Sequence, residues 1–172
     1  MVIGISEDEE RKLCTEVFNF VTKFAKRTRP DQTIVTTAMT YFHKYCRIRS
    51  FKNFNRYLIG AVCVFLACKV KYMPIRLDVA VKEYYMMEFE LLNPTFKKKL
   101  TPAPTVLHAY GDDFKQKELD ILEAIGFDVE THLPYPYLSD LSSQLGETLS
   151  SISCNFINDS FMGPTCLFYH PK

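Results

Sequence analysis

The segment that decides the fold reads YLIGAVCVFLACKV and spans Tyr57–Val70, with Lys69 as its only charged residue. A helix that is apolar on every side must be enclosed by other elements. A buried strand is the alternative, since valine and isoleucine are present, but strands usually run for only about 3–10 residues. The length therefore favours a buried helix. Four small residues would let neighbouring backbones approach it closely: Gly60, Ala61, Ala67 and Cys68.

Amphipathic patterns predict two helices before this segment. Ser6 and Glu9 have the spacing of a capping box, and apolar residues then recur at helical intervals over residues 7–28. A second helix follows a cap formed by Asp31 or Thr33. Both helices present an apolar face that could cover the central segment.

Two more helices are predicted after it, separated by loops. Residues 47–53 lack a clear period and indicate a loop that leads into the apolar segment. A fourth helix is predicted over residues 75–91, and the prolines and lysines of residues 93–110 indicate an exposed loop. A fifth helix begins at a cap formed by Asp112 or Asp113.

The composition excludes several classes of protein. The 172 residues are 47% hydrophobic, which suits one packed domain, or one domain and part of a second. The net charge of +1 points to neither a nucleic acid nor a membrane surface, and no run of 18 apolar residues could span a membrane. The six cysteines lack zinc-ligand spacing, so we expect reduced thiols in an intracellular protein. The N-terminus does not resemble a signal peptide.

The sequence also lacks the short motifs of nucleotide-binding, zinc-protease and serine-hydrolase sites. We therefore expect no enzymatic activity, no catalytic residue, no metal and no cofactor. His43 lies within an apolar helical pattern, where a histidine is more often a satisfied core or rim residue than a base or a ligand.

One local charge pattern stands out. Nine basic residues and one acidic residue lie between Lys23 and Arg56, which gives this stretch a charge of +8. A solvated rim of helix ends is one interpretation. A patch for phosphate, an acidic peptide or RNA is the other. The candidate residues of that basic patch are Arg47, Arg49, Lys52 and Arg56.

Five short motifs occur in order along the chain: YFHKY at 41–45, SFKNF at 50–54, LACKV at 66–70, GFDV at 126–129 and FINDS at 156–160. Together they resemble the motifs of a cyclin box, and most closely those of the transcription-associated cyclins of the K, T and L types. The resemblance implies an all-α fold. This fold is a five-helix cyclin box with a central buried helix, followed by the start of a second, truncated box.

The resemblance also divides the chain. Residues 1–30 would form an N-terminal helix that packs on the box, and residues 31–130 the core helices of the first box. Residues 131–153 would be a linker, and residues 154–172 the beginning of an incomplete second box. Charged residues are scarce from residue 131 onward, which sets this last part apart from the first box.

The function implied by the resemblance is regulation of a protein kinase. A cyclin forms a heterodimer with a cyclin-dependent kinase and activates it allosterically, here one of the class that acts on RNA polymerase II transcription. It pushes the kinase's mobile helix inward, which completes the kinase's own Lys–Glu pair. Such a protein would act in the nucleus, or in both nucleus and cytoplasm.

In cyclins, a lysine at the end of the third helix pairs with a glutamate of the fifth helix against the kinase. Lys69 and Glu118 match these two positions. Alternatively, Lys69 only extends from an apolar helix to water, and Glu118 is an ordinary exposed residue. Four apolar residues match positions that pack on the kinase, or else belong to the core: Val70, Leu122, Phe127 and Val129.

The sequence departs from the family at one functional position. The family usually reads KVEE, whereas residues 69–72 read KVKY, so an acidic contact to a kinase arginine is in doubt. Two alternatives therefore stay open. One is a scaffold that binds partners without activating a kinase. The other, suggested by the basic stretch, is a nucleic-acid-binding cyclin-box transcription factor similar to the general factor IIB type.

Overall fold

The protein is all-helical in the computed structural model, which describes residues 6–29, 31–95 and 101–168, without the side chains of residues 52 and 142–145. The α-helices are α1 (Glu7–Thr28), α2 (Gln32–Ile48), α3 (Arg56–Val70), α4 (Leu77–Leu92), α5 (Pro104–Ala124) and α6 (Tyr135–Ser160). Short 3-10 turns occupy Phe51–Asn53 and Pro164–Leu167. No strand occurs in the described ranges, so the predicted all-α class is confirmed.

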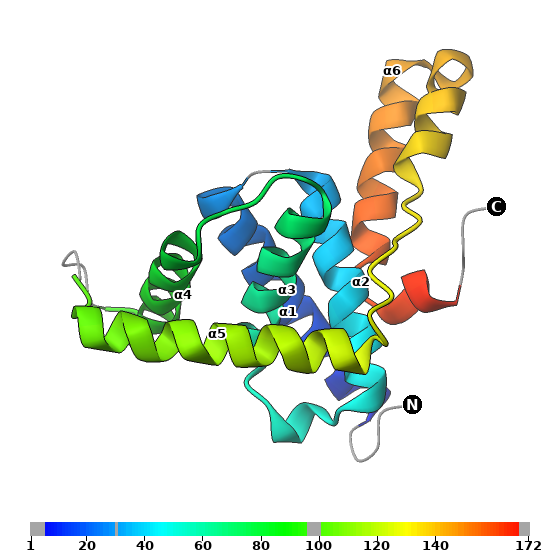
Figure 1. Ribbon diagram of the computed structural model, residues 1–172. Coiled ribbons are helices and arrows are strands. Elements are labelled where there is room, and N and C mark those ends of the chain that lie inside the picture. Colours follow the sequence, from blue (N-terminus) through cyan, green and yellow to red (C-terminus); the bar gives the residue numbers. More distant parts are fainter. Residues whose placement is uncertain (1–5, 30, 96–100, 169–172) are drawn as a thin grey trace.

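The apolar segment forms α3, and it lies at the centre of the other helices (Figure 1). Every residue from Ile59 to Cys68 is buried, and α3 contacts α1, α2, α4 and α5. A Cβ atom built on Gly60 would lie 3.0 Å from Cγ2 of Val21 and 3.2 Å from Cγ1 of Val17. The close approach expected from the small residues of this segment is therefore present between α1 and α3, and the strand alternative is wrong.

The predicted caps fix where the first helices begin. The Ser6 hydroxyl accepts a hydrogen bond of 3.3 Å from the Glu9 backbone N–H at the start of α1. A carboxylate oxygen of Asp31 accepts bonds of 2.7 Å from the Thr33 backbone and 2.6 Å from its hydroxyl. These bonds hold the pKa of Asp31 below its ordinary value. Asp31, rather than Thr33, is thus the cap of α2.

Two loop predictions need correction. α5 begins at Pro104, well before the predicted caps at Asp112 and Asp113. A proline suits the first turn of a helix, because its missing N–H would have no partner there. α2 likewise extends to Ile48, within the stretch predicted as a loop. The lysine run at residues 97–99 lies outside the described residues.

The segment expected to be a linker is largely helical. α6 breaks at Gly146, whose φ of 73° and ψ of 163° are open to glycine and unfavourable for other residues. Figure 1 shows the two arms of α6 turning back on each other and projecting from the remaining helices. The Tyr135 hydroxyl donates a hydrogen bond of 2.7 Å to the Asn158 side-chain oxygen, which ties the arms together near their base.

Candidate protein-binding site

Lys69 and Glu118 form an ion pair at the surface between α3 and α5. The Lys69 ammonium lies 2.6 Å from Oε1 and 2.8 Å from Oε2 of Glu118. The Lys69 side chain is 44% exposed and that of Glu118 is 15% exposed. The Lys69 ammonium also lies 4.3 Å from the centre of the Phe65 ring, within range of a cation–π contact. The structure therefore brings the two predicted residues together and holds the lysine in place.

The packing of two aromatic residues explains this geometry. Phe65 and Phe114 are buried and meet edge to face, with ring centres 6.2 Å apart. Lys69 follows Phe65 by four residues and Glu118 follows Phe114 by four, so each charged residue lies one turn along the same helix face. The aromatic contact inside the core thereby aligns the ion pair at the surface.

The four apolar candidates do not share one environment. Val70, Leu122 and Val129 are half-buried and pack against the core. Phe127 is 62% exposed. The core interpretation is thus partly correct for the first three, whereas Phe127 is largely exposed to solvent.

The end of α5 explains why Phe127 projects. Its backbone N–H donates 2.8 Å to the Leu122 carbonyl, and the N–H of Gly126 donates 3.1 Å to the Glu123 carbonyl. This is the hydrogen-bond pattern of a Schellman motif, in which the residue after the cap adopts a left-handed conformation. Gly126 has a φ of 66° and Phe127 a φ of 57°.

The segment that follows is fixed against α2. The Tyr41 hydroxyl donates a hydrogen bond of 2.6 Å to the Val129 carbonyl. Burial raises the pKa of Tyr41, so its hydroxyl stays protonated and remains a donor. The Lys44 ammonium lies 2.8 Å from a carboxylate oxygen of Asp128 and lowers the pKa of that carboxyl. Phe127 and Val129 are therefore presented from an anchored backbone.

The end of α3 has the same motif, with a different residue at the left-handed position. The Met73 N–H donates 2.9 Å to the Cys68 carbonyl, and the Tyr72 N–H donates 3.2 Å to the Lys69 carbonyl. Tyr72 has a φ of 57°, which costs a residue other than glycine roughly 1–2 kcal/mol. From the sequence, Tyr72 is recognised only as part of the departure from KVEE. Its left-handed conformation could not be predicted, because tyrosine is not typical of left-handed turns.

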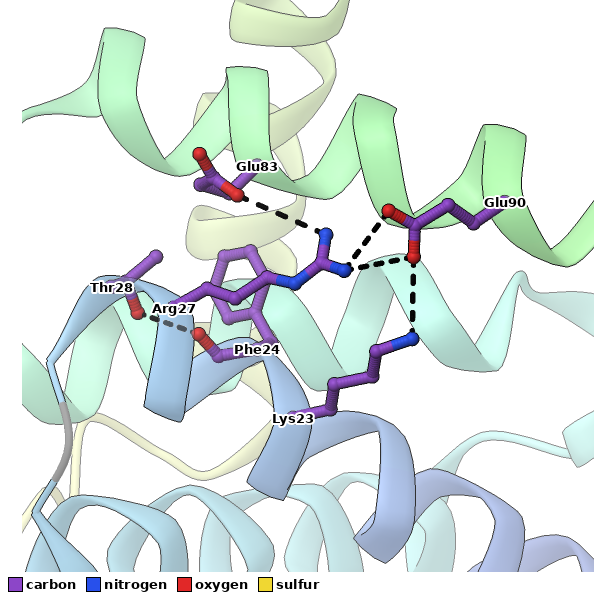
Figure 2. A network of polar contacts seen from close by, with 6 residues as sticks. All are labelled: Lys23, Phe24, Arg27, Thr28, Glu83 and Glu90. Carbon is purple, nitrogen blue, oxygen red and sulfur yellow. Dashed lines mark hydrogen bonds and ion pairs between the residues drawn. The ribbon is translucent and has the colours of Figure 1, made fainter. Parts of the chain in front are cut away.

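The basic stretch is largely neutralised by carboxylates from other helices. A guanidinium nitrogen of Arg27 in α1 lies 2.8 Å from a carboxylate oxygen of Glu90 in α4, and the Lys23 ammonium lies 3.2 Å from the same carboxylate (Figure 2). A carboxylate oxygen of Glu83 lies 4.0 Å from another guanidinium nitrogen of Arg27. Burial raises the pKa of Glu90, but hydrogen bonds from Arg27 and Lys23 outweigh it and place that pKa below its ordinary value.

The basic-patch candidates are engaged separately. Arg49 lies 3.1 Å from Asp120 in α5, and Arg56 lies 2.9 Å from Glu16 in α1. Arg47 lies over the Phe168 ring, 5.7 Å from its centre. The Lys52 side chain lies outside the described residues. The rim interpretation fits these positions better than an open cationic patch does.

Three further observations concern the chemistry of the chain. Among the described side chains, no group of three His, Cys, Asp or Glu residues is placed to hold a metal ion. All six cysteines are free thiols. No helix within the described ranges has the length and apolar character needed to cross a membrane.

Comparison with known proteins shows the family. The model of the cyclin N-terminal domain matches residues 2–130. Cyclin-K of Danio rerio is 30% identical over 148 residues, covering 80% of this chain and 32% of that protein. Cyclin pch1 of Schizosaccharomyces pombe is 28% identical over 176 residues, covering 98% and 49%. Cyclin-T1-3 of Oryza sativa is 27% identical over 177 residues, covering 98% and 34%.

The fold has a match among solved structures. A chain in the crystal structure of the yeast RNA Pol II CTD kinase CTDK-1 complex superposes with a TM-score of 0.76 at 17% identity. The match covers 95% of this chain and 51% of that chain. The present chain thus spans about half or less of these proteins, and residues 131–172 lie outside the matched family model. The resemblance to K- and T-type cyclins is confirmed, and the chain belongs to the cyclin family.

Proposed function

We propose that this chain is a regulatory subunit that binds a transcription-type cyclin-dependent kinase in the nucleus and activates it allosterically. The observation that carries the proposal is the Lys69–Glu118 pair, because both residues stand where the family places its kinase-facing pair and their charged groups are in contact. On this proposal the chain supplies no catalytic group. Its contribution is binding free energy that differs between two conformations of the kinase.

Activation requires a large difference between the binding free energies for the two kinase conformations. A ligand moves a two-state equilibrium from 1:99 to 99:1 only if it binds the favoured state about 10⁴-fold more tightly, which is about 5.5 kcal/mol. In this mechanism the favoured state has the kinase's mobile helix pushed inward and its own Lys–Glu pair formed. The cyclin surface must therefore fit the inward position of that helix and fit the outward position poorly.

Contacts within the free chain support this proposal. At the surface of the free chain, a partly exposed ion pair such as Lys69–Glu118 contributes about 1 kcal/mol or less to stability. In an interface that excludes water, loss of one partner leaves an uncompensated charge and costs about 3–5 kcal/mol. Exposed Phe127 would supply the aromatic anchor of the contact. The half-buried edges of Val70, Leu122 and Val129 would contribute apolar surface beside it.

The test is capture and activation of purified transcription-type cyclin-dependent kinases by three variants: Lys69→Glu, Glu118→Lys and the double exchange. Each single variant should lose binding by about 100-fold or more, because a charge is left unpaired at the interface. The double exchange restores attraction within the chain but reverses the charges that face the kinase. It should therefore also fail to activate.

A matched control is the double exchange Lys23→Glu with Glu90→Lys in the exposed cluster between α1 and α4, where Arg27 keeps Glu83 as an acidic neighbour (Figure 2). This variant should bind and activate like the unaltered chain. Unchanged activation by the Lys69 and Glu118 variants would refute the proposed site. Kinase capture without any activation by the unaltered chain would instead assign it the scaffold function.

A further inference from the structure

Tyr72 combines three properties that the fold does not require. Its side chain is 94% exposed, its backbone is left-handed with a φ of 57°, and it lies two residues after the end of α3. A single exposed aromatic residue is ordinary in a folded protein. The conformation is not, because bulky residues rarely adopt positive φ values outside strained or functional positions.

The same chain contains this turn with a glycine at the first left-handed position, although the residue after that glycine, Phe127, also has a positive φ of 57°. The helix α5 ends in the same hydrogen-bond pattern, and there Gly126 occupies the position that Tyr72 occupies at the end of α3. Glycine is the usual residue at that position because it lacks a Cβ atom. Tyrosine there adds strain and, being almost wholly exposed, recovers little packing energy. The folding of this chain therefore gives no reason for the side chain of Tyr72.

The surroundings place Tyr72 at the edge of the proposed kinase-binding surface. It lies three residues after Lys69, whose ammonium binds Glu118. The side chain of the intervening Lys71 reaches the Thr131 hydroxyl at 3.2 Å, which ties the turn to the segment after α5. The turn is thus held from both sides, and Tyr72 extends from it into solvent.

The charged groups at this edge indicate which kind of kinase surface Tyr72 would contact. Lys69 is balanced by Glu118, but Lys71 is bound only to a neutral hydroxyl among the contacts described here. Where the family usually has two acidic residues, this surface therefore has a positive charge and an aromatic ring. A kinase arginine opposite the turn would be repelled by Lys71.

We infer that Tyr72 is a specificity-determining contact for the partner kinase, packing on a kinase surface that carries no cationic group at that point. This inference rests on the proposed function. The strained turn presents the ring to the partner, and binding covers apolar area that the free chain leaves in water. Lys71 excludes kinases that carry an arginine there.

The decisive variant is Tyr72→Gly, which removes the ring and relaxes the turn. Its melting temperature should equal or exceed that of the unaltered chain, while its affinity for the captured transcription-type kinase should fall by about tenfold or more. Tyr72→Phe keeps the ring and should retain most of the affinity. Phe156→Ala removes another exposed aromatic residue, on α6, and should change neither quantity.

A second variant tests the exclusion of arginine. Replacing both residues, Lys71→Glu with Tyr72→Glu, restores the acidic pair usual in the family. It should weaken binding to the chain's own kinase and strengthen binding to purified cyclin-dependent kinases that have an arginine facing that turn. No gain for any such kinase would overturn the exclusion of arginine.

The outcomes separate this inference from the function on which it rests. If the unaltered chain captures no kinase, both are overturned. If it captures a kinase and Lys69→Glu abolishes capture while Tyr72→Gly does not, only the role of Tyr72 is overturned. A lower melting temperature for Tyr72→Gly would also overturn it, because the side chain would then serve the fold.

Discussion

His43 joins α2 to the end of α6 through a buried hydrogen bond. Its Nε2 lies 3.0 Å from the carbonyl oxygen of Phe161, and the side chain is 2% exposed. Because a carbonyl only accepts, Nε2 must carry the proton. Burial lowers the pKa of His43 to about 4, even though the bond to Phe161 acts in the opposite direction. This is the satisfied core histidine that the sequence favoured over a base or a ligand.

The buried imidazole predicts an acid-sensitive fold. In the unfolded chain His43 has a pKa of about 6.5, whereas in the folded chain its pKa is about 4. Between pH 6.5 and pH 4 the unfolded state therefore binds a proton at His43 that the folded state does not bind. The contribution that the neutral, buried His43 makes to the free energy of unfolding is fully present above about pH 6.5. It is lost as the pH falls toward 4. Urea unfolding should show a loss of about 2 kcal/mol between about pH 7.5 and pH 5.

The control for that prediction is His43→Gln, which supplies an amide donor near the position of Nε2 and does not titrate in this range. The variant should be less stable at neutral pH because its shape differs from that of imidazole. Its stability should nevertheless change much less between pH 7.5 and pH 5. An equal pH dependence in both proteins would show that another group is responsible.

Helix limits could be predicted best where capping residues mark the ends of a helix. The limits of α1 were predicted as 7–28 and are Glu7–Thr28, because Ser6 and Glu9 mark the start within four residues of sequence. The start of α5 was missed because Pro104 is consistent with both a loop and a first helical turn. Only contacts with the rest of the fold, such as that of Phe114 with Phe65, decide between these two.

The candidate site likewise has features that the sequence could predict and features that it could not. The contact between Lys69 and Glu118 joins residues 49 positions apart, so residue periodicity alone could not predict it and the family resemblance could. The two interpretations of the +8 stretch could not be separated by counting charges along the sequence, because that count omits the carboxylates that folding brings close from other helices. Glu90 lies 63 residues from Arg27, yet the two are in contact.

Gly60 should be the most size-sensitive position of the α1–α3 contact. A Cβ atom there would already lie 3.0 Å from Val21 and 3.2 Å from Val17, and valine side chains have little freedom to turn away. We expect Gly60→Val to lower the free energy of unfolding by about 2 kcal/mol or more through overpacking. Urea unfolding monitored by circular dichroism measures this change.

Gly111 provides the comparison, since it also lies inside a helix but a Cβ atom added to it would meet no heavy atom within 4 Å among the described residues. There Gly111→Ala should raise stability by up to about 1 kcal/mol, because alanine favours helix without meeting an obstacle. Opposite signs at the two glycines are the expected result. A loss of stability at both would mean that close packing is not what distinguishes Gly60.

The neutralised basic stretch predicts weak binding to nucleic acid. Nine phosphate contacts would give a slope of about −8 for the logarithm of affinity against the logarithm of salt concentration. Five of the nine basic residues already pair with carboxylates: Lys23, Arg27, Lys44, Arg49 and Arg56. We therefore expect a slope no steeper than about −4 in anisotropy titrations with duplex DNA or RNA.

Freeing two of these cations tests the explanation. In the double variant Glu83→Gln with Glu90→Gln, Lys23 and Arg27 lose the carboxylates shown in Figure 2. The slope should then steepen by about 2. A slope near −8 in the unaltered chain would support the transcription-factor alternative instead.

Gly146 should control the return of the second arm of α6. Its φ of 73° with a ψ of 163° lies in a region that residues other than glycine enter at a cost of about 1–3 kcal/mol. A Cβ atom there would meet no heavy atom within 4 Å among the described residues, so Gly146→Ala should act through the backbone alone. Its effect should be local, because the arms project from the other helices (Figure 1).

Hydrogen exchange of amides in residues 147–158 is the appropriate measurement, since it reports opening of this arm without global unfolding. Gly146→Ala should accelerate exchange there by roughly 5- to 150-fold, which corresponds to the conformational cost of about 1–3 kcal/mol for the substitution. Gly163→Ala is the control, because its φ of −122° is open to any residue and its new Cβ would lie 3.9 Å from the Thr165 hydroxyl, an ordinary contact. If both variants exchanged at the same rate, the reversal of α6 would depend on contacts between the arms, such as that of Tyr135 with Asn158, rather than on the glycine.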